Sequence, residues 1–517
     1  MTDSHDDLAG TARSKGAEPS IIEGFGIEGL YGYRSISLAS EYAATILIAK
    51  NGTGKTTLLG ALDAFLRMQL SRLRNLEFSQ IHCKLRAEDS ELVLSHNDVV
   101  EFLQVPTDGE LVRLASRANI EPNALFAFLT EEWSGHDDFS YSPSENGAFS
   151  AVLSASNYSH RETVSALNKA RDSLTERQPN VAKIKSVLDR ALNGIDIVYL
   201  PTYRRVELAL RRNDSREAPH RKRRPRFDVA AGSLFTGEIQ FGLSDISERL
   251  SQLNQQIILA SNSGYRKISA DIINELIDGS FENEETSDAD VPSPDELKLF
   301  FERLERGRRQ GPFMPISVPN LGKIYTGEGV PTSSSRFLNY FLAKLATVIR
   351  STKDLELPID GFINSCNKYL VSTEPSTILE EGEKSTDVRG IDGKALKVNR
   401  ANLRVHVESV PEGRRISLDA LSSGEKQMIS LFAKMFLYAG RKIVLIDEPE
   451  LSLSIDWQKD ILVDVLNAPQ CGQLVAITHS PFVFDNELEP FARALQIGTV
   501  DIPFDPEEEE AGSELDA

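Results

Sequence analysis

The chain has 517 residues, of which 26% are charged, and a formal net charge of −20. This length allows two or more compact units, whereas the acidic charge argues against polyanion binding by the surface as a whole. No apolar run is long enough to span a membrane, no signal-peptide pattern opens the chain, and Cys83, Cys366 and Cys471 form no metal-spaced pair. We therefore expect a cytoplasmic protein with no membrane partner and reduced cysteines.

The first ordered element is expected after residue 19, because residues 1–19 are polar and typical of a disordered tail. Residues 45–48 form an apolar, β-branched run that predicts a buried strand, and residues 57–66 have helical spacing. Between them, residues 49–56 read Ala-Lys-Asn-Gly-Thr-Gly-Lys-Thr, a P-loop pattern with Ala49 at the usual first glycine. A strand, a loop and a helix in this order are the context that a P-loop requires.

The P-loop residues predict an ATP site with a magnesium ion. Gly52 and Gly54 let the backbone bend so that successive N–H groups face the β-phosphate. Lys55 is expected to reach the β- and γ-phosphates, and the Thr56 hydroxyl is expected to ligate Mg²⁺. The residues predicted to bind the nucleotide in this segment are Asn51, Gly52, Thr53, Gly54, Lys55, Thr56 and Thr57.

The middle of the chain predicts a globular, mostly helical region. A hairpin is expected at residues 81–94, and a strand-like run ends near residue 200. Helical patches follow, broken by Pro, Gly and Ser and without a sustained heptad repeat. These patches cover residues 165–192, 246–259, 335–349 and 361–370.

Arg204 and Arg226 bound a segment that is dense in arginine and lysine within this acidic chain. Three interpretations stay open. The segment could be a solvated loop, it could bind nucleic acid, or it could bind an acidic partner or the chain's own acidic residues 282–290. Tyr203 and Phe227 are the aromatic residues at its edges, which gives little support for base stacking.

Residues 421–425, which read Leu-Ser-Ser-Gly-Glu, predict the start of a helix that continues to residue 438. Ser422 or Ser423 can cap this helix, and Gly424 leaves the backbone open to an anion. Most P-loop enzymes have no segment of this kind. It therefore distinguishes one class of P-loop protein from the others.

An apolar run at residues 443–446 ends in Asp447 and Glu448, so a buried strand is expected to deliver two carboxylates at its C-terminal end. Asp447 is expected to hold Mg²⁺ through water, and Glu448 to polarise the attacking water as a catalytic residue. One helix and one strand later, His479 follows a strand expected at residues 473–477. At that position a histidine can donate to the γ-phosphate.

Taken together, these segments resemble the RecF/SMC/OLD branch of the ATP-binding-cassette ATPases, specifically over residues 20–110 and 400–485. Within that branch the chain is similar to the stand-alone ATPases of bacterial anti-phage systems, namely those of the Septu and PARIS systems and of retrons. Residues 198–207 and 241–245 add to this resemblance. Ser423, where relatives usually have a second glycine, departs from it.

The resemblance implies roles for three segments. His479 corresponds to the catalytic switch histidine, and residues 451–458 correspond to the D-loop between the two sites of a dimer. The signature motif, which contacts the γ-phosphate held by the opposite protomer, is implied at Ser422, Ser423 and Gly424.

Two further family motifs match weakly. The Q-loop has two candidate positions, residues 199–202 and Gln80, and Gln80 is better interpreted as a strand end. Residues 380–387 resemble the first half of a Toprim metal motif, but no Asp-x-Asp follows at a suitable distance. We interpret them as a solvated loop. Any nuclease chemistry is therefore assigned to another chain.

The implied fold is α/β, a bilobed ABC-type P-loop ATPase head with a large, mostly helical globular insertion between the lobes. The expected parts include a first lobe with the P-loop and a second lobe with the signature, the paired carboxylates and the histidine. Their bounds are 1–19 for the disordered tail, 20–110 for the first lobe, 111–395 for the insertion, 396–500 for the second lobe and 501–517 for an acidic tail.

The implied function is that of an ATP-binding and ATP-hydrolysing regulator in anti-phage defence. It would assemble through ATP as a homodimer or a larger even-numbered oligomer, and it would control a separate effector, a nuclease or toxin encoded nearby. The alternative is a RecF-like repair ATPase that holds DNA through the segment between Arg204 and Arg226. A transport or translation subunit is a third class, and the large insertion without coiled coil argues against it.

Overall fold

In a computed structural model, the described residues are 12–50, 52–133, 147–157, 159–201, 243–278, 291–308, 319–326, 332–370, 393–410, 412–417, 420–451 and 453–499. They form two compact units. Unit 1 comprises Met1–Ile239 and Gly440–Ala517, and unit 2 comprises Gln240–Ala439. Asn51, the entire basic segment between Arg204 and Arg226, the Toprim-like residues 380–387 and the acidic tail lie outside the described residues.

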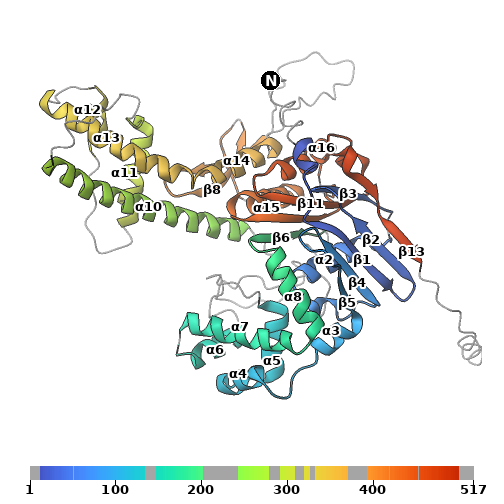
Figure 1. The fold of residues 1–517 in the computed structure, drawn as a ribbon. Helices are drawn as coiled ribbons and strands as arrows, with labels where there is room; N and C mark the ends of the chain where they lie inside the picture. Colours follow the sequence, from blue (N-terminus) through green and yellow to red (C-terminus); the bar gives the residue numbers. More distant parts are fainter. Residues whose placement is uncertain are drawn as a thin grey trace, which may run out of the picture. The chain divides into compact units, whose positions relative to one another are not determined.

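A parallel sheet of five strands lies at the centre of unit 1 (Figure 1). Its order is β12 (Ala492–Ala494), β3 (Ala44–Ile48), β11 (Cys471–Thr478), β10 (Arg441–Asp447) and β6 (Ile195–Leu200). Every residue of β11 is buried, as expected for a parallel strand that is covered on both faces. The strands predicted at residues 45–48, 443–446 and 473–477 are confirmed.

Two helices pack on this sheet. The first, α2 (Lys55–Leu66), contacts β10 and β6, and the second, α16 (Ile455–Asn467), contacts β11. The helix predicted at residues 57–66 is therefore confirmed and begins two residues earlier. Asp63 of α2 is buried, and its carboxylate pairs at 2.7 Å with both Arg67 and Arg72. This ion pairing compensates the buried charge.

A second, antiparallel sheet of unit 1 has the order β13 (Gln496–Thr499), β2 (Arg34–Ala39), β1 (Ile22–Leu30), β4 (Gln80–Leu85) and β5 (Leu92–Ser95). The predicted hairpin is confirmed by the β4–β5 pair, and Gln80 is the first residue of β4. Gln473 of β11 joins the two sheets. Its amide oxygen accepts the N–H groups of Ile21 and Ile22 at 2.9 and 2.8 Å, and its NH₂ donates to Ser40 Oγ at 2.9 Å.

Most of the helices of unit 1 follow β5, and one short helix, η1 (Leu70–Leu73), precedes the β4–β5 hairpin. The helices after β5 are α3 (His96–Phe102), α4 (Glu110–Ala118), α5 (Pro122–Ala127), η2 (Phe128–Glu132), α6 (Gly147–Ala155), α7 (His160–Glu176) and α8 (Pro179–Ala191). The helical patch predicted at residues 165–192 is confirmed by α7 and α8. Leu167 and Ile184 of these helices belong to the same buried cluster as Leu59 of α2 and Ile443 of β10. The helices and the central sheet therefore share one hydrophobic core.

Unit 2 combines long helices with a three-stranded antiparallel sheet. Its elements are α10 (Leu243–Ile277), α11 (Pro294–Arg308), α12 (Leu321–Thr326), α13 (Thr332–Lys353), α14 (Leu357–Leu370), β7 (Gly393–Asn399), β8 (Arg404–Val410), β9 (Arg415–Ile416) and α15 (Ser423–Leu437). The helices predicted at residues 246–259, 335–349, 361–370 and 425–438 are confirmed. None of the helices in the described part of the chain has both the length and the apolar character needed to cross a membrane.

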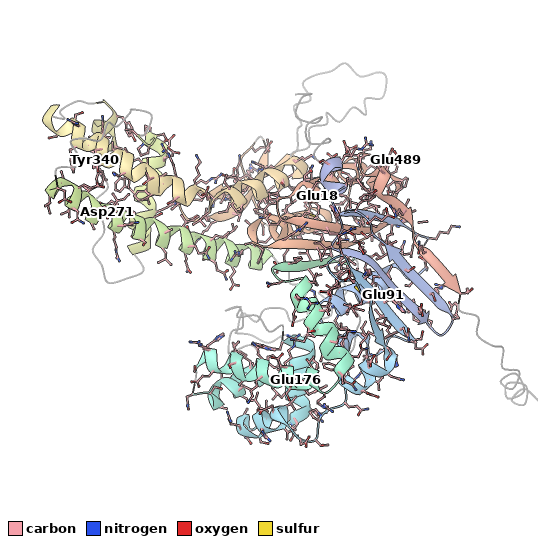
Figure 2. The ribbon with its side chains drawn as sticks, in the orientation of Figure 1. Glu18, Glu91, Glu176, Asp271, Tyr340 and Glu489 are labelled. Carbon is pink, nitrogen blue, oxygen red and sulfur yellow. The ribbon has the colours of Figure 1, made fainter. Side chains whose placement is uncertain are left out.

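The long helices α10 and α13 lie side by side within unit 2 (Figure 1). Gly264 permits this approach, since a Cβ atom there would lie 2.5 Å from Val348 Cγ1. Tyr340 of α13 belongs to a further buried cluster, which draws on α10, α11 and α13 (Figure 2). The Tyr340 hydroxyl donates to Glu275, so this helical part of unit 2 has both an apolar core and polar links.

Two features differ from the sequence expectations. The prediction of a disordered tail is wrong for residues 12–19, because residues 12–16 form a helical segment and the Lys15 ammonium donates to Ala468 O at 2.7 Å. The boundary between the two units falls inside the predicted second lobe. Residues 396–439 of that lobe belong to unit 2, whereas the strands β10 and β11 pair within the central sheet of unit 1.

Candidate nucleotide-binding site

The P-loop connects β3 to α2 and has two residues in the left-handed region. Gly52 has φ 80° and Gly54 has φ 93°, which glycine adopts without steric penalty. A Cβ atom on Gly52 would meet no heavy atom within 4 Å, so the described backbone is open there. Gly54 is the N-cap of α2 and offers no side chain to its first N–H groups. These N–H groups can therefore donate to an anion.

Lys55 places a buried ammonium between the P-loop and the end of β10. Its side chain is 4% exposed, and Nζ donates to Ala49 O at 3.1 Å and lies 3.6 Å from Glu448 Oε1. The next residue, Thr56, is half-buried. The Thr53 hydroxyl turns away to the loop itself and donates to Lys50 O at 2.8 Å.

Asp447 and Glu448 stand at the C-terminal end of β10. Asp447 is fully buried, whereas the Glu448 side chain is 18% exposed. Glu448 has φ 52°, a region in which few residues other than glycine are found. Its N–H donates to Ile477 O at 2.8 Å, which holds this backbone against β11. Strained backbone of this kind concentrates at functional sites.

His479 follows β11 and lies close to two carboxylates. Its Nδ1 is 3.9 Å from Glu448 Oε1 and 3.0 Å from Glu450 Oε1. In the central sheet β11 lies between β3 and β10, and the carboxyl ends of neighbouring parallel strands meet at one edge. The fold thus brings Lys55, Asp447, Glu448 and His479 together from three distant segments.

Glu450 is a residue of this cluster that the sequence reasoning missed. Its side chain is 5% exposed. Its carboxylate accepts the Thr478 hydroxyl at 2.8 Å and the His479 N–H at 3.1 Å. The available signal was a third carboxylate two positions after Glu448.

The turn between β1 and β2 supplies a second contact that was missed. The Arg34 guanidinium donates to Gly52 O at 3.0 Å, and the Tyr31 hydroxyl lies 3.5 Å from Thr57 Oγ1. Tyr31 and Tyr33 are 48% and 44% exposed. No local sequence pattern announces this turn as a P-loop neighbour, because the contact depends on how β1 and β2 pair.

Ser422, Ser423 and Gly424 lie in unit 2 and are described apart from this cluster. Ser422 is the N-cap of α15, as predicted, and it forms a capping box with Glu425. Lys394 Nζ of β7 lies 2.9 Å from both carboxylate oxygens of Glu425. Burial opposes ionisation of Glu425, but the hydrogen bonds from Lys394 and Ser422 outweigh it and lower the pKa of this carboxyl.

The donor set of unit 1 fits a magnesium nucleotide. Mg²⁺ prefers oxygen ligands and takes one or two from the protein with the remainder from phosphates and water. The Thr56 hydroxyl and the Asp447 carboxylate are oxygen donors of this type, and Lys55 adds a cation for the phosphates. In the described ranges no group of three His, Cys, Asp or Glu residues forms a cage for a metal.

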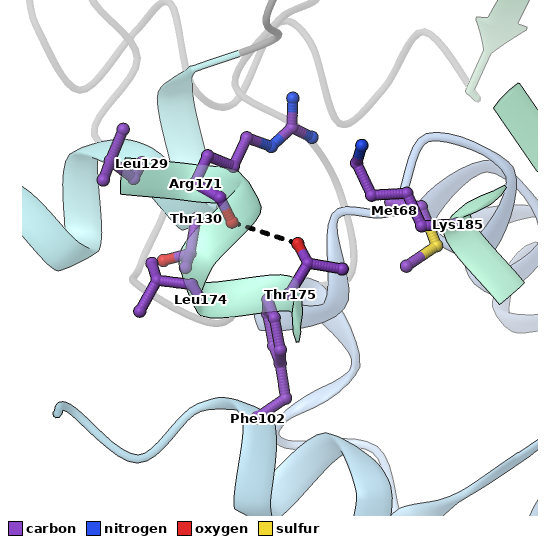
Figure 3. Close-up of a pocket in the computed structure, with 8 residues that line it drawn as sticks. All are labelled: Met68, Phe102, Leu129, Thr130, Arg171, Leu174, Thr175 and Lys185. Carbon is purple, nitrogen blue, oxygen red and sulfur yellow. Dashed lines mark hydrogen bonds between the residues drawn. The ribbon is translucent and has the colours of Figure 1, made fainter. Parts of the chain in front are cut away.

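A small pocket in the helical part of unit 1 is separate from this cluster (Figure 3). It has room for little more than a water molecule. The Thr175 hydroxyl inside it donates to Arg171 O at 3.1 Å. The pocket contains none of the predicted site residues and is lined by Met68, Phe102, Leu129, Thr130, Arg171, Leu174, Thr175 and Lys185.

Two solved Smc head structures resemble the fold weakly. "Crystal structure of the SmcHead bound to the C-winged helix domain of ScpA" shares 10% identity, covers 94% of this chain and 98% of that chain, and has a TM-score of 0.32. "Crystal structure of the Smc head domain with an extended coiled coil bound to the C-terminal domain of ScpA derived from Pyrococcus furiosus" shares 11% identity, with 93% and 96% coverage and a TM-score of 0.33.

The match to a protein family is extensive. The family described as "AAA domain, putative AbiEii toxin, Type IV TA system" matches residues 45–485. This range runs from the strand before the P-loop to beyond His479 and includes both carboxylates at the end of β10. The chain therefore belongs to this family of AAA-type P-loop ATPases.

Proposed function

We propose that the protein binds ATP with Mg²⁺ and hydrolyses it, and that this ATPase controls a separate effector in anti-phage defence. The convergence of Lys55, Glu448 and His479 at one edge of the central sheet is the observation that supports ATP chemistry most strongly. Each of these side chains comes from a different segment and has a distinct task in phosphoryl transfer.

In this proposal the chain holds the triphosphate and orients water. The N–H groups that begin at Gly52 and the Lys55 ammonium bind the phosphates, while Thr56 and Asp447 hold Mg²⁺. A magnesium ion held there by Thr56 and Asp447 would neutralise negative charge on the phosphates. Glu448 accepts a hydrogen bond from the attacking water and orients it. His479 contacts the γ-phosphate at the end of β11.

Two copies complete the proposed site. Ser422, Ser423 and Gly424 of a second copy would contact the γ-phosphate held by Lys55, so that ATP joins the protomers into a homodimer or a larger even-numbered oligomer. The capped N-terminus of the 15-residue helix α15 supports this role, since a helix N-terminus attracts anions.

We also propose that residues 20–110 and 396–500 act as the two lobes of the ATPase head, with residues 111–395 as the insertion. The pairing of β3 with β11 supports this organisation, because it joins the two ends of the chain in one sheet. A cryo-EM structure of the ATP-bound oligomer tests it. If residues 396–439 lie away from the nucleotide of either copy, the second lobe is smaller than proposed.

The family description names a putative toxin of a type IV toxin–antitoxin system, which supports a toxin–antitoxin context. Control of a separate toxin or nuclease is our proposal within that context. The test is affinity purification of the tagged protein from its native operon, followed by mass spectrometry and nucleic-acid analysis. A stoichiometric toxin or nuclease from the same operon supports the proposal. A preparation that contains only the protein and DNA contradicts it.

The ATPase assignment itself has a direct test. Glu448→Gln should leave ATP bound and the oligomer closed while hydrolysis falls about 100-fold or more, because the water loses its orienting carboxylate. Lys55→Ala should lose ATP binding and serves as the opposite variant. A Glu448→Gln protein that hydrolyses ATP as fast as wild type would show that Glu448 has another role.

A RecF-like repair ATPase is the second candidate, and the density of basic residues between Arg204 and Arg226 favours it. Such a protein would bind duplex DNA in an ATP-dependent and salt-sensitive manner. Neutralising residues 221–224 together should then abolish DNA binding while ATP binding persists. DNA binding that survives this change would place the DNA contact elsewhere.

A further inference from the structure

Glu450 has a buried carboxylate that, among the described residues, accepts hydrogen bonds from the end of β11. Oε2 accepts the Thr478 hydroxyl at 2.8 Å, and Oε1 accepts the His479 N–H at 3.1 Å. The same Oε1 lies 3.0 Å from His479 Nδ1. A buried carboxylate destabilises a fold unless it is paired and hydrogen-bonded. Here the pairing involves both the backbone and the ring of one histidine.

The distances distinguish the two carboxylates beside this ring. Glu450 Oε1 is within hydrogen-bond distance of Nδ1, whereas Glu448 Oε1 lies 3.9 Å away. A carboxylate oxygen at 3.0 Å favours the form in which Nδ1 carries the proton, because an unprotonated Nδ1 would place two acceptors against each other. Nε2 is then the ring nitrogen on the side opposite Glu450. A partner on one nitrogen thereby decides which tautomer a histidine adopts.

A second link connects the same two segments. The Ser480 hydroxyl donates to Gln458 Oε1 at 2.9 Å, and the Gln458 NH₂ donates to Leu453 O at 3.1 Å. The residues after β10 and those after β11 are therefore joined on both sides of His479. These contacts hold the backbone on either side of His479 next to the segment that carries Glu450.

We propose that Glu450 is a positioning residue for His479, which holds the Nδ1–H form of the ring and presents Nε2 to the γ-phosphate. This inference rests on the proposed ATPase function. It assigns separate roles to neighbouring carboxylates, since Glu448 acts on water and Glu450 acts only through His479. The competing explanation is that Glu450 merely closes the end of β11, in which case its loss changes stability alone.

A double-mutant cycle separates these explanations. Glu450→Gln keeps the shape and one acceptor oxygen but removes the carboxylate, and it is combined with His479→Gln. We expect Glu450→Gln to lower kcat roughly tenfold with KM for ATP within about twofold. In the His479→Gln background it should lower kcat no further. Glu489→Gln, an exposed carboxylate of unit 1 labelled in Figure 2, is the matched control and should change neither value.

Three outcomes overturn the proposal. The first is an unchanged kcat in Glu450→Gln. The second is that Glu450→Gln lowers kcat in the His479→Gln background by the same factor as in wild type. The third is that the loss of kcat/KM in Glu450→Gln comes entirely from a higher KM for ATP. Unfolding temperatures measured on every variant show whether a loss of kcat accompanies a loss of folding. If a variant does not fold, the proposal is tested instead by a spectroscopic measurement on the wild-type protein.

That measurement reads the histidine ring without hydrolysis. In protein with ¹⁵N-labelled histidine, His479→Gln identifies the resonances of His479, and a titration selects a pH at which the ring is neutral. We expect the Nδ1–H tautomer in wild type and a mixture of tautomers in Glu450→Gln. An Nε2–H tautomer in wild type overturns the inference. Protein that lacks ATPase activity but has the Nδ1–H tautomer would refute the proposed function and leave the tautomer assignment intact.

Discussion

The Lys55 ammonium lies 3.6 Å from the Glu448 carboxylate, and both side chains are largely withdrawn from solvent, at 4% and 18% exposure. The lysine expected to bind phosphates thus already faces the carboxylate expected to orient water. A triphosphate that reaches Lys55 must compete with this carboxylate. The pair would connect nucleotide affinity to Glu448, the residue proposed to be catalytic.

Removal of the negative charge should therefore tighten nucleotide binding. Glu448→Gln is expected to lower the Kd for ATP about fivefold, because an ion pair of this type contributes ~1 kcal/mol. Isothermal titration calorimetry checks this value with hydrolysis suppressed, and Glu489→Gln is the control. Weaker or unchanged ATP affinity in Glu448→Gln would show that the two side chains do not compete.

The hydrogen bond from Arg34 to the P-loop predicts a second effect on affinity. Arg34→Ala should raise the Kd for ATP about three- to tenfold, because the Gly52 carbonyl loses a charge-assisted hydrogen bond worth ~1 kcal/mol that holds the loop. Arg113→Ala removes an exposed arginine of unit 1 and should not change the Kd. Equal effects of both variants would indicate a general charge effect instead of a local contact.

Gln473 predicts a large effect on stability. Gln473→Leu leaves the N–H groups of Ile21 and Ile22 without their acceptor, so the free energy of unfolding of unit 1 should fall by about 3 kcal/mol or more. Urea denaturation measures the change. Gln496→Leu removes an exposed glutamine, and its effect should stay within about 0.5 kcal/mol. If the two variants unfold alike, the bridge between the sheets contributes little.

The Lys394–Glu425 pair predicts a dependence of unit 2 on pH. The folded-state pKa of Glu425 lies below the unfolded-state value of about 4.3. The pair therefore stabilises the fold above that value, and the stabilisation is lost as pH falls through the folded-state pKa. Lys394→Met should be less stable than wild type at pH 7 and equally stable once Glu425 is protonated in both.

Thermal unfolding across acidic and neutral pH checks this prediction. Lys397→Met serves as the control, because Lys397 is an exposed lysine of the same strand β7. It should parallel wild type at every pH. A difference between Lys394→Met and wild type that persists in strong acid would assign the effect to lost packing of the lysine stem and not to the ion pair.

Much of the secondary structure could be predicted because its signals are local. The β-branched run before the P-loop, the apolar run before Asp447 and the serine that caps α15 all act over a few residues. Their periodicity and capping chemistry therefore indicate strands and a helix directly. The prediction of a disordered tail was wrong for residues 12–19 because their order depends on a long-range contact. Lys15 is held by Ala468, a residue far away along the chain.

The contacts of the candidate site were harder to predict. In the sequence, nothing distinguishes Glu450 from other acidic residues near Glu448, and nothing distinguishes Arg34 from other basic residues in strands. Their partners, His479 and Gly52, become neighbours only after the strands take the order in which β11 separates β3 from β10 and β1 pairs with β2. Strand order is a long-range property that no local pattern contains.

The sequence by itself determined the class of chemistry, because glycine backbone freedom, a lysine, a hydroxyl and paired carboxylates at these spacings are requirements of phosphate and magnesium binding. The tertiary structure alone decided which side chains meet. It placed Lys55 next to Glu448 and His479 next to Glu450, because distances between side chains on different strands follow from sheet register and burial.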